Sequence, residues 1–171
     1  MRYRVGKRRY ATSCRAVTSS ERCKVGDAAM KVRVSQRLEA PADAVFMDVG
    51  DFGNLDRLDV VAACTVEGNG VGAVRTVTFT DPTLGRVVER LEAYDPIART
   101  FSYSIINEDC VLPVANYLAT VRVLEDGPSA CVLEWGSDFQ LRDMEEPEAR
   151  RMFEGFYMQA IDAARRSVEK S

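Results

Sequence analysis

Alternating apolar and polar residues run through most of this chain from about residue 30 onward. Residues 31–39 read KVRVSQRLE, with Val32, Val34 and Leu38 at alternate positions and polar side chains between them. Since successive side chains of a strand point to opposite faces of its sheet, this pattern predicts a half-buried β-strand. The short turns that follow favour an antiparallel meander. Strand patterns predict six more strands at about 60–67, 73–80, 85–94, 99–106, 115–124 and 130–140.

Two segments repeat their apolar residues with the period of a helix instead. Pro41 suits the first turn of a helix, and residues 42–49 continue it with one apolar stripe. A short second helix is expected at about 53–58. A long helix is expected from about Pro147 onward, with acidic residues in its first turn and basic residues near its end. The apolar stripe of this long helix needs a broad partner, and we expect it to pack on a curved antiparallel sheet.

The length and composition indicate one domain large enough for an internal cavity. The chain has 171 residues, of which 46% are hydrophobic and 29% are charged. No apolar run approaches the roughly 18 residues that a membrane-spanning helix requires, and no secretory-type apolar core lies near the N-terminus. We therefore expect no membrane span and a cytoplasmic location.

The histidine and cysteine content narrows the chemistry. The chain has no histidine, which removes the commonest general base and the commonest metal ligand. We expect neither a metal nor a cofactor, and acid or base chemistry must fall to Asp, Glu, Tyr, Lys or Cys. The odd number of cysteines and their spacing match no zinc motif, so we expect reduced thiols at Cys14, Cys23, Cys64, Cys110 and Cys131.

The first 29 residues differ in charge from the rest. They carry eight basic and two acidic residues, a net charge of about +6, whereas the whole chain carries −3. Three interpretations are open: a basic arm for nucleic acid or an acidic surface, a targeting peptide, or an extension upstream of a start at Met30. We favour the last, so residues 1–29 are expected to be a disordered basic extension of a domain at 30–171.

Three polar residues interrupt the apolar rows of the predicted sheet. Glu89 is assigned to the inward row of the strand predicted at 85–94, Tyr117 to that of the strand at 115–124, and Glu134 to that of the strand at 130–140. Trp135 is then expected to face outward, on the surface or at a dimer contact. Carboxylates in apolar rows are costly unless they are partnered or hydrated, so the pattern favours a cavity with polar anchors.

Arg75 is expected on the same face, which leaves three interpretations of the polar positions. The first is a buried ion pair between Arg75 and a carboxylate. The second is that a carboxylate, together with Tyr117, contacts a ligand directly or through water. The third is catalysis by Glu89, Glu134 or Tyr117, because two carboxylates in one apolar pocket can raise the pKa of one of them.

The order of these elements resembles that of the START-like (SRPBCC) superfamily. This superfamily includes bacterial polyketide cyclase/dehydrase-like proteins, birch-pollen-allergen-like proteins and plant abscisic-acid receptors. The resemblance covers about residues 30–168 and implies an α+β helix-grip fold: about seven curved antiparallel strands wrapped on a long C-terminal helix, with two short helices after the first strand. The segments that carry it are VGAVR (71–75), ERL (89–91), FSYSII (101–106), LPVANY (112–117), VLEW (132–135) and RMF (151–153).

The resemblance also implies a ligand pocket between the sheet and the long helix. Ala62 stands where the plant receptors place a lysine, so the bacterial polyketide cyclase-like proteins are the closer analogy. The loops at 80–85 and 109–113 correspond to those that close over the ligand of the receptors. The positions that match the receptor pocket are Val77, Phe79, Glu89, Tyr103, Ile105, Tyr117, Ala119, Glu134, Phe153, Tyr157 and Ile161.

We therefore expect a protein that binds a small hydrophobic or amphipathic molecule, lipid-like or polyketide-like, in an internal cavity. A polyketide cyclase or dehydratase is the alternative, and a module whose loops present a protein-binding surface when ligand is bound is a third. Nucleic acid is not an expected partner. The sequence is compatible with a monomer or a homodimer.

Overall fold

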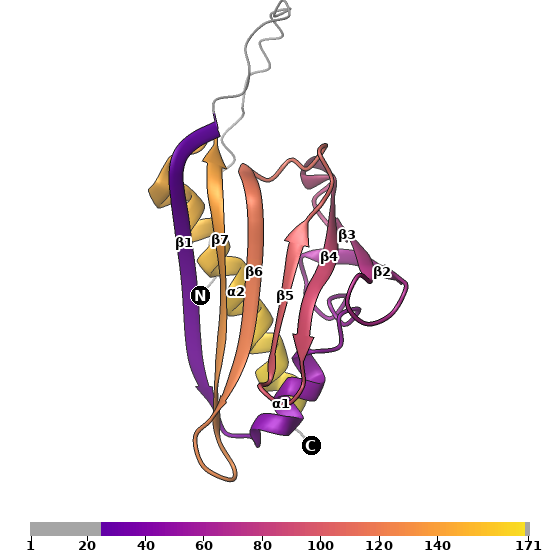
Figure 1. The fold of residues 1–171 in the computed structure, drawn as a ribbon, viewed down its shortest axis with the longest axis vertical. Helices are drawn as coiled ribbons and strands as arrows, with labels where there is room; N and C mark the ends of the chain where they lie inside the picture. Colours follow the sequence, from indigo (N-terminus) through magenta and orange to yellow (C-terminus); the bar gives the residue numbers. More distant parts are fainter. Residues whose placement is uncertain (1–24, 170–171) are drawn as a thin grey trace, which may run out of the picture.

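The computed structural model describes residues 25–169 and consists of one sheet, two α-helices and a short 3₁₀ helix (Figure 1). Residues 1–24 of the predicted extension lie outside the described residues. Residues 25–29, which were assigned to the same extension, form the start of the first strand. In chain order the elements are β1 (Val25–Leu38), α1 (Ala42–Val49), β2 (Val61–Glu67), β3 (Val74–Phe79), η1 (Pro82–Leu84), β4 (Arg86–Asp95), β5 (Thr100–Ile105), β6 (Val114–Glu125), β7 (Cys131–Arg142) and α2 (Glu146–Val168).

All seven strands form one antiparallel sheet in the order β1-β7-β6-β5-β4-β3-β2. The strands from β2 to β7 are a meander, and β1 joins the sheet beside β7, the last strand in the chain. Figure 1 shows α2 lying diagonally across one face of this curved sheet, with α1 near its C-terminal end. The α+β helix-grip fold expected from the sequence is confirmed, and the strands begin and end close to the predicted positions.

The second short helix predicted at about 53–58 is not formed. This segment is a series of turns, in which isolated backbone hydrogen bonds run from the amide of Asn54 to the carbonyl oxygen of Asp51 and from the amide of Leu58 to that of Leu55. A helix needs a succession of bonds between residues four apart, and Gly53 opens the segment with the residue that is second only to proline in opposing helix formation. Leu58 is buried nonetheless.

The core lies between α2 and the sheet face that α2 covers. Val32 on β1, Leu133 on β7 and Ile161 on α2 are fully buried there. Of the cysteines, Cys64, Cys110 and Cys131 are free thiols, while Cys14 and Cys23 lie outside the described residues. Among residues 25–169, no helix is both long enough and apolar enough to span a membrane.

The predicted orientation of β7 was wrong by one residue. Trp135 is 4% exposed and faces the core, whereas Glu134 is partly exposed. The pairing explains this result, because directly opposed residues of neighbouring strands share a face and Trp135 lies opposite the buried Val121 of β6. The inward row of β7 is therefore Leu133, Trp135, Ser137 and Phe139, and Glu134 lies on the outer face.

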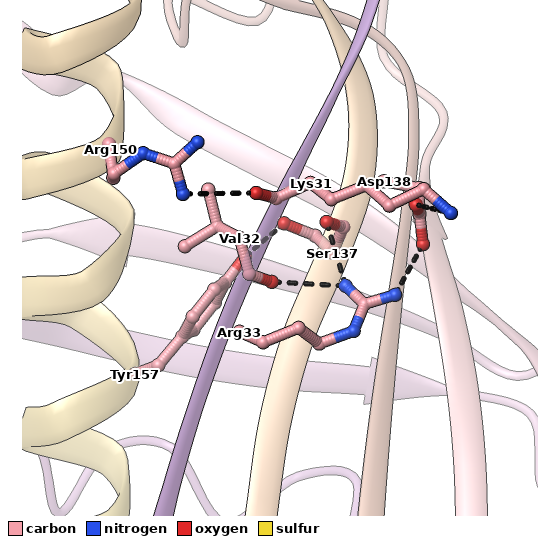
Figure 2. Close-up of polar contacts among 7 residues, drawn as sticks. All are labelled: Lys31, Val32, Arg33, Ser137, Asp138, Arg150 and Tyr157. Atoms are coloured by element: carbon pink, nitrogen blue, oxygen red, sulfur yellow. Dashed lines mark hydrogen bonds and ion pairs between the residues drawn. The ribbon is translucent and has the colours of Figure 1, made fainter.

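Arg33 covers the outer face of the sheet where β1 meets β7 (Figure 2). Its Nη1 donates hydrogen bonds to the carbonyl oxygens of Val32 (3.0 Å) and Ser137 (2.9 Å), and its Nη2 donates to Oδ2 of Asp138 (2.6 Å). The guanidinium lies over Gly136, which is buried although it belongs to the outer row. A residue without a side chain thus allows the arginine to join the two strands.

Candidate functional site

A cavity of about 80 Å³ lies between the inner face of the sheet and α2. This volume exceeds the ~10–15 Å³ that one water molecule needs, so the cavity holds more than one water-sized group. Most of its lining is apolar, which favours ligands with a large apolar part. The lining residues are Leu55, Leu58, Val61, Arg75, Val77, Phe79, Val87, Glu89, Tyr103, Ile105, Leu112, Tyr117, Trp135, Phe153, Phe156, Tyr157 and Ala160.

Hydroxyl groups from three elements meet beside this cavity. The hydroxyl of Tyr157 on α2 lies 2.8 Å from that of Tyr117 on β6 and 2.5 Å from that of Ser137 on β7. Figure 2 shows Tyr157 reaching across from α2 to Ser137. Nearby, Nε1 of Trp135 donates a hydrogen bond of 3.0 Å to the hydroxyl of Tyr103 on β5. The helix and the sheet are therefore joined by buried polar contacts at the cavity wall.

Arg75 and Glu89 form a buried ion pair in the same wall, as the first interpretation of the sequence predicted. They are opposed on β3 and β4, and Nε of Arg75 donates to Oε2 of Glu89 at 2.6 Å. The Arg75 side chain is 3% exposed and that of Glu89 is 10% exposed. Arg75 also donates from Nη1 to the carbonyl oxygen of Phe52 (2.9 Å), and its guanidinium stacks on the rings of Phe52 and Tyr103, 4.1 and 4.5 Å from their centroids.

The charge of Arg75 is stabilised in this position. Burial alone would lower the pKa of Arg75, but the carboxylate of Glu89 and the neighbouring polar groups outweigh burial, and the pKa is raised above its usual value. The guanidinium is therefore a permanent cation that holds Glu89.

Burial also sets the protonation of the tyrosines. Burial, assisted by the charge of Glu89, raises the pKa of Tyr103 to about 12. Burial likewise raises the pKa of Tyr117 and of Tyr157 well above the usual value. All three phenols stay protonated at neutral pH, so they supply hydrogen-bond donors and acceptors to the cavity and do not act as bases.

The raised pKa of Tyr103 predicts a loss of stability at alkaline pH. As the pH rises from about 10 toward 12, an unfolded tyrosine ionises while the folded Tyr103 stays neutral, so unfolding becomes easier by about 2 kcal/mol. We expect the Tyr103→Phe variant to lose less stability than the parent protein over this range. Urea denaturation at pH 9 and pH 11.5 measures the difference, and an equal loss in both proteins would contradict the assignment.

The structure brings together most of the residues that the sequence placed at a pocket. Those that line the cavity are Val77, Phe79, Glu89, Tyr103, Ile105, Tyr117, Phe153 and Tyr157, together with Arg75. Ala119 and Ile161 are fully buried but are not part of the lining. Glu134 lies on the outer face of β7, so it is separated from Glu89 and Tyr117, and the two carboxylates do not share a pocket.

Several lining residues were missed by the sequence reasoning. Val87 precedes Glu89 by two positions in the same inward row, so the alternation of β4 was sufficient to find it. Trp135 was excluded by the wrong orientation of β7. Leu55 and Leu58 come from an irregular segment whose sequence has no period, and no local signal identifies them as cavity residues.

The described part of the chain contains no group of three or more Cys, Asp or Glu side chains arranged to hold a metal ion. Among the lining residues that the structure describes, Glu89 is the carboxylate, and Arg75 already binds it. The chemistry that the cavity offers is therefore hydrogen bonding from phenols and the edge of a guanidinium, inside an apolar surface.

Comparison with known proteins places the chain among others of the same fold. Residues 29–169 match the model of a family described as polyketide cyclase / dehydrase and lipid transport. MLP-like protein 423 of Arabidopsis thaliana is 25% identical over 133 residues, which cover 71% of this chain and 84% of that protein.

Two solved structures illustrate the likeness in three dimensions. The protein XoxI from Bacillus cereus is 27% identical with a TM-score of 0.71, and the match covers 81% of this chain and 94% of that one. An aromatase/cyclase from a Streptomyces species is 17% identical with a TM-score of 0.68, over 84% of this chain and 95% of that one. The second likeness is one of fold alone.

Proposed function

Because the chain belongs to the polyketide cyclase / dehydrase and lipid transport family, we propose that it binds a small, mainly apolar molecule between the sheet and α2. The observation that carries this proposal is the lining itself: an apolar wall interrupted by the hydroxyls of Tyr103, Tyr117 and Tyr157. Sites for small molecules combine these features, since apolar surface supplies affinity and a few polar groups fix orientation.

The hydroxyl network has capacity left for a ligand. Each hydroxyl offers one donor and two acceptor positions, and two hydrogen bonds join the hydroxyls of Ser137, Tyr157 and Tyr117. These two bonds use two of the three hydroxyl donors, and the Tyr117 hydroxyl also interacts with Tyr103, so the positions left for a ligand are acceptor positions. A hydroxyl group on an otherwise apolar ligand can donate to one of them.

Cyclisation or dehydration is the second candidate function, and the family description includes both cyclase and dehydrase. Such reactions need a group that takes up a proton near the substrate. Glu89 is the carboxylate among the described lining residues. It is buried and accepts a hydrogen bond from Arg75, so its role is to pair with that arginine and not to take up a proton from a substrate. The phenols have raised pKa values and stay protonated. These observations favour binding over acid–base catalysis.

Filling the cavity should weaken binding without unfolding the protein. Ala160 on α2 lines the cavity, and the flexible side chain of the Ala160→Met variant is expected to occupy it. We expect the affinity for the neutral fluorescent probe N-phenyl-1-naphthylamine to fall at least about 10-fold, an increase of ~1.4 kcal/mol in binding free energy. Fluorescence titration measures the affinity.

The Gln159→Met variant is the matched control, because it introduces the same side chain at the adjacent, exposed position of α2. Its affinity for the probe should equal that of the parent protein. If the parent protein does not bind the probe, or if the two methionine variants bind it equally, the proposed cavity function is wrong. Circular dichroism establishes that both variants are folded.

A further inference from the structure

A second cavity of about 150 Å³ lies where β5 and β6 separate. The pairing of these strands ends at Ser104 and Leu118, and β6 has an irregular register between Ala115 and Leu118. Asn116 within this irregularity has a φ of 52°, a left-handed conformation that breaks the strand. The segment 106–113 connects the two strands around the opening, so the second cavity is built into the end of the sheet.

The second cavity adjoins the first. Ile105 and Tyr117 line both of them, so one side of each of these residues faces the apolar cavity and the other faces the opening between the strands. The side chains of Ile105 and Tyr117 are therefore the wall between the two cavities, and one ligand can extend from the first into the second when these side chains turn aside. The two spaces differ in character. In the first, Arg75 and Glu89 pair with each other within a mostly apolar wall, whereas Asn107, Asn116, Glu108 and Arg142 make up much of the wall of the second.

Most of the polar side chains of the second cavity are already engaged. Oδ1 of Asn107 accepts the amide of Val88 (2.8 Å) and its Nδ2 donates to Asp109 (2.7 Å), while Nδ2 of Asn116 donates to Gln140 (2.7 Å). These bonds shape the wall of the cavity. The asparagines are therefore structural.

Arg142, at the end of β7, is the exception. Its Nε is buried and has no hydrogen-bond partner among the described residues. A buried donor of a charged group without a partner costs more than a neutral one, so the Arg142 side chain gains stability if it turns its guanidinium toward an acceptor in the cavity that it lines. Glu108 also lines the cavity, but its side chain is exposed, so solvent and salt screen its repulsion of an anion.

We propose that Arg142 binds the carboxylate of a ligand whose apolar part occupies the cavity between the sheet and α2, an inference that rests on the function proposed above. A guanidinium matches a carboxylate in shape and charge, and hydrogen bonds between charged groups are the stronger kind. The protein then selects amphipathic acids over neutral molecules with the same apolar part.

Displacement of N-phenyl-1-naphthylamine by 4-phenylbutyrate and by 4-phenylbutyramide tests this proposal. The two competitors share a phenyl ring and a flexible chain, and they differ in the charge of the head group. At pH 7 we expect the acid to displace the probe at a concentration at least about 10-fold lower than the amide. In the Arg142→Gln variant the acid should lose this advantage, while the affinity of the amide and of the probe stays within about twofold.

The control is Arg122→Gln, which removes the same charge from an exposed position of β6 that lines neither cavity. This variant should keep the preference for the acid. Equal displacement by acid and amide in the parent protein, or an equal loss of preference in both variants, would overturn the role of Arg142 while leaving the cavity function intact. Displacement of the probe by acetate alone at the same concentration would overturn the two-part ligand, and failure of the probe to bind would overturn both proposals.

Discussion

Replacing Arg75 with methionine should lower the free energy of unfolding by about 3–5 kcal/mol. The substitution keeps a long apolar side chain between Phe52 and Tyr103, but it leaves the carboxylate of Glu89 without its partner at a position that is 10% exposed. An unpaired buried charge is among the most destabilising changes that a single residue can cause. Guanidinium chloride denaturation followed by circular dichroism measures the loss.

The double variant Arg75→Met with Glu89→Leu separates the cost of an unpaired charge from the loss of packing. Removing both charges leaves apolar side chains of similar size, and such replacements are often neutral or stabilising. We therefore expect the double variant to regain most of the stability that the single variant loses. If the single variant loses less than about 1 kcal/mol, the carboxylate is better solvated than the ion pair implies.

Replacing Gly136 with alanine should cost about 3 kcal/mol, the upper end of what an extra methyl group costs in a packed site. The new Cβ atom would lie 2.5 Å from the carbonyl oxygen of Val32 and closer still to the Arg33 side chain. Arg33 can rotate away only by giving up its bonds to Val32, Ser137 and Asp138, and the backbone oxygen cannot rotate at all. The strands β1 and β7 must therefore separate.

The same substitution in α2 provides a matched control. A Cβ atom on Gly155 would meet no other atom within 4 Å, and alanine is better than glycine inside a helix by roughly 1 kcal/mol. Gly155→Ala should therefore stabilise the protein as Gly136→Ala destabilises it, and thermal and urea denaturation of the two variants give the comparison. Similar stabilities for both variants would show that β1 and β7 tolerate a wider spacing.

The alternation of apolar and polar residues predicts the strands and the fold well. It does not predict which face of a strand is buried where both rows of that strand contain apolar and polar residues. In β4 the inward row is apolar except for Glu89, and the orientation of that strand was predicted correctly. In β7 the inward row contains Ser137 and the outer row contains Val132 and Gly136, so neither row is recognisable by composition. The pairing with β6 fixes the orientation, and a pairing register is a property of two strands that neither one encodes alone.

The contacts within the site were predictable to different degrees. Arg75 and Glu89 both belong to the inward rows of adjacent strands, and the alternation of residues along each strand was enough to suggest the ion pair. The bond between Tyr117 and Tyr157 depends on how α2 crosses the sheet, and no pattern along the chain determines that crossing. The same holds for Arg142, whose position matters because β5 and β6 diverge beside it.

The place of β1 at the sheet edge beside β7 also governs how the chain folds. Val32 pairs with Ser137, so the first strand finds its partner only after β2 to β6 have been synthesised. Until then β1 is an unpaired strand that is open to wrong partners, and Lys31, Arg33 and Arg37 on its outer row supply the positive charge that keeps such strands from associating. Non-local strand pairs form more slowly than local ones, so we expect the pairing of β1 with β7 to form later than the hairpins of β2 to β7.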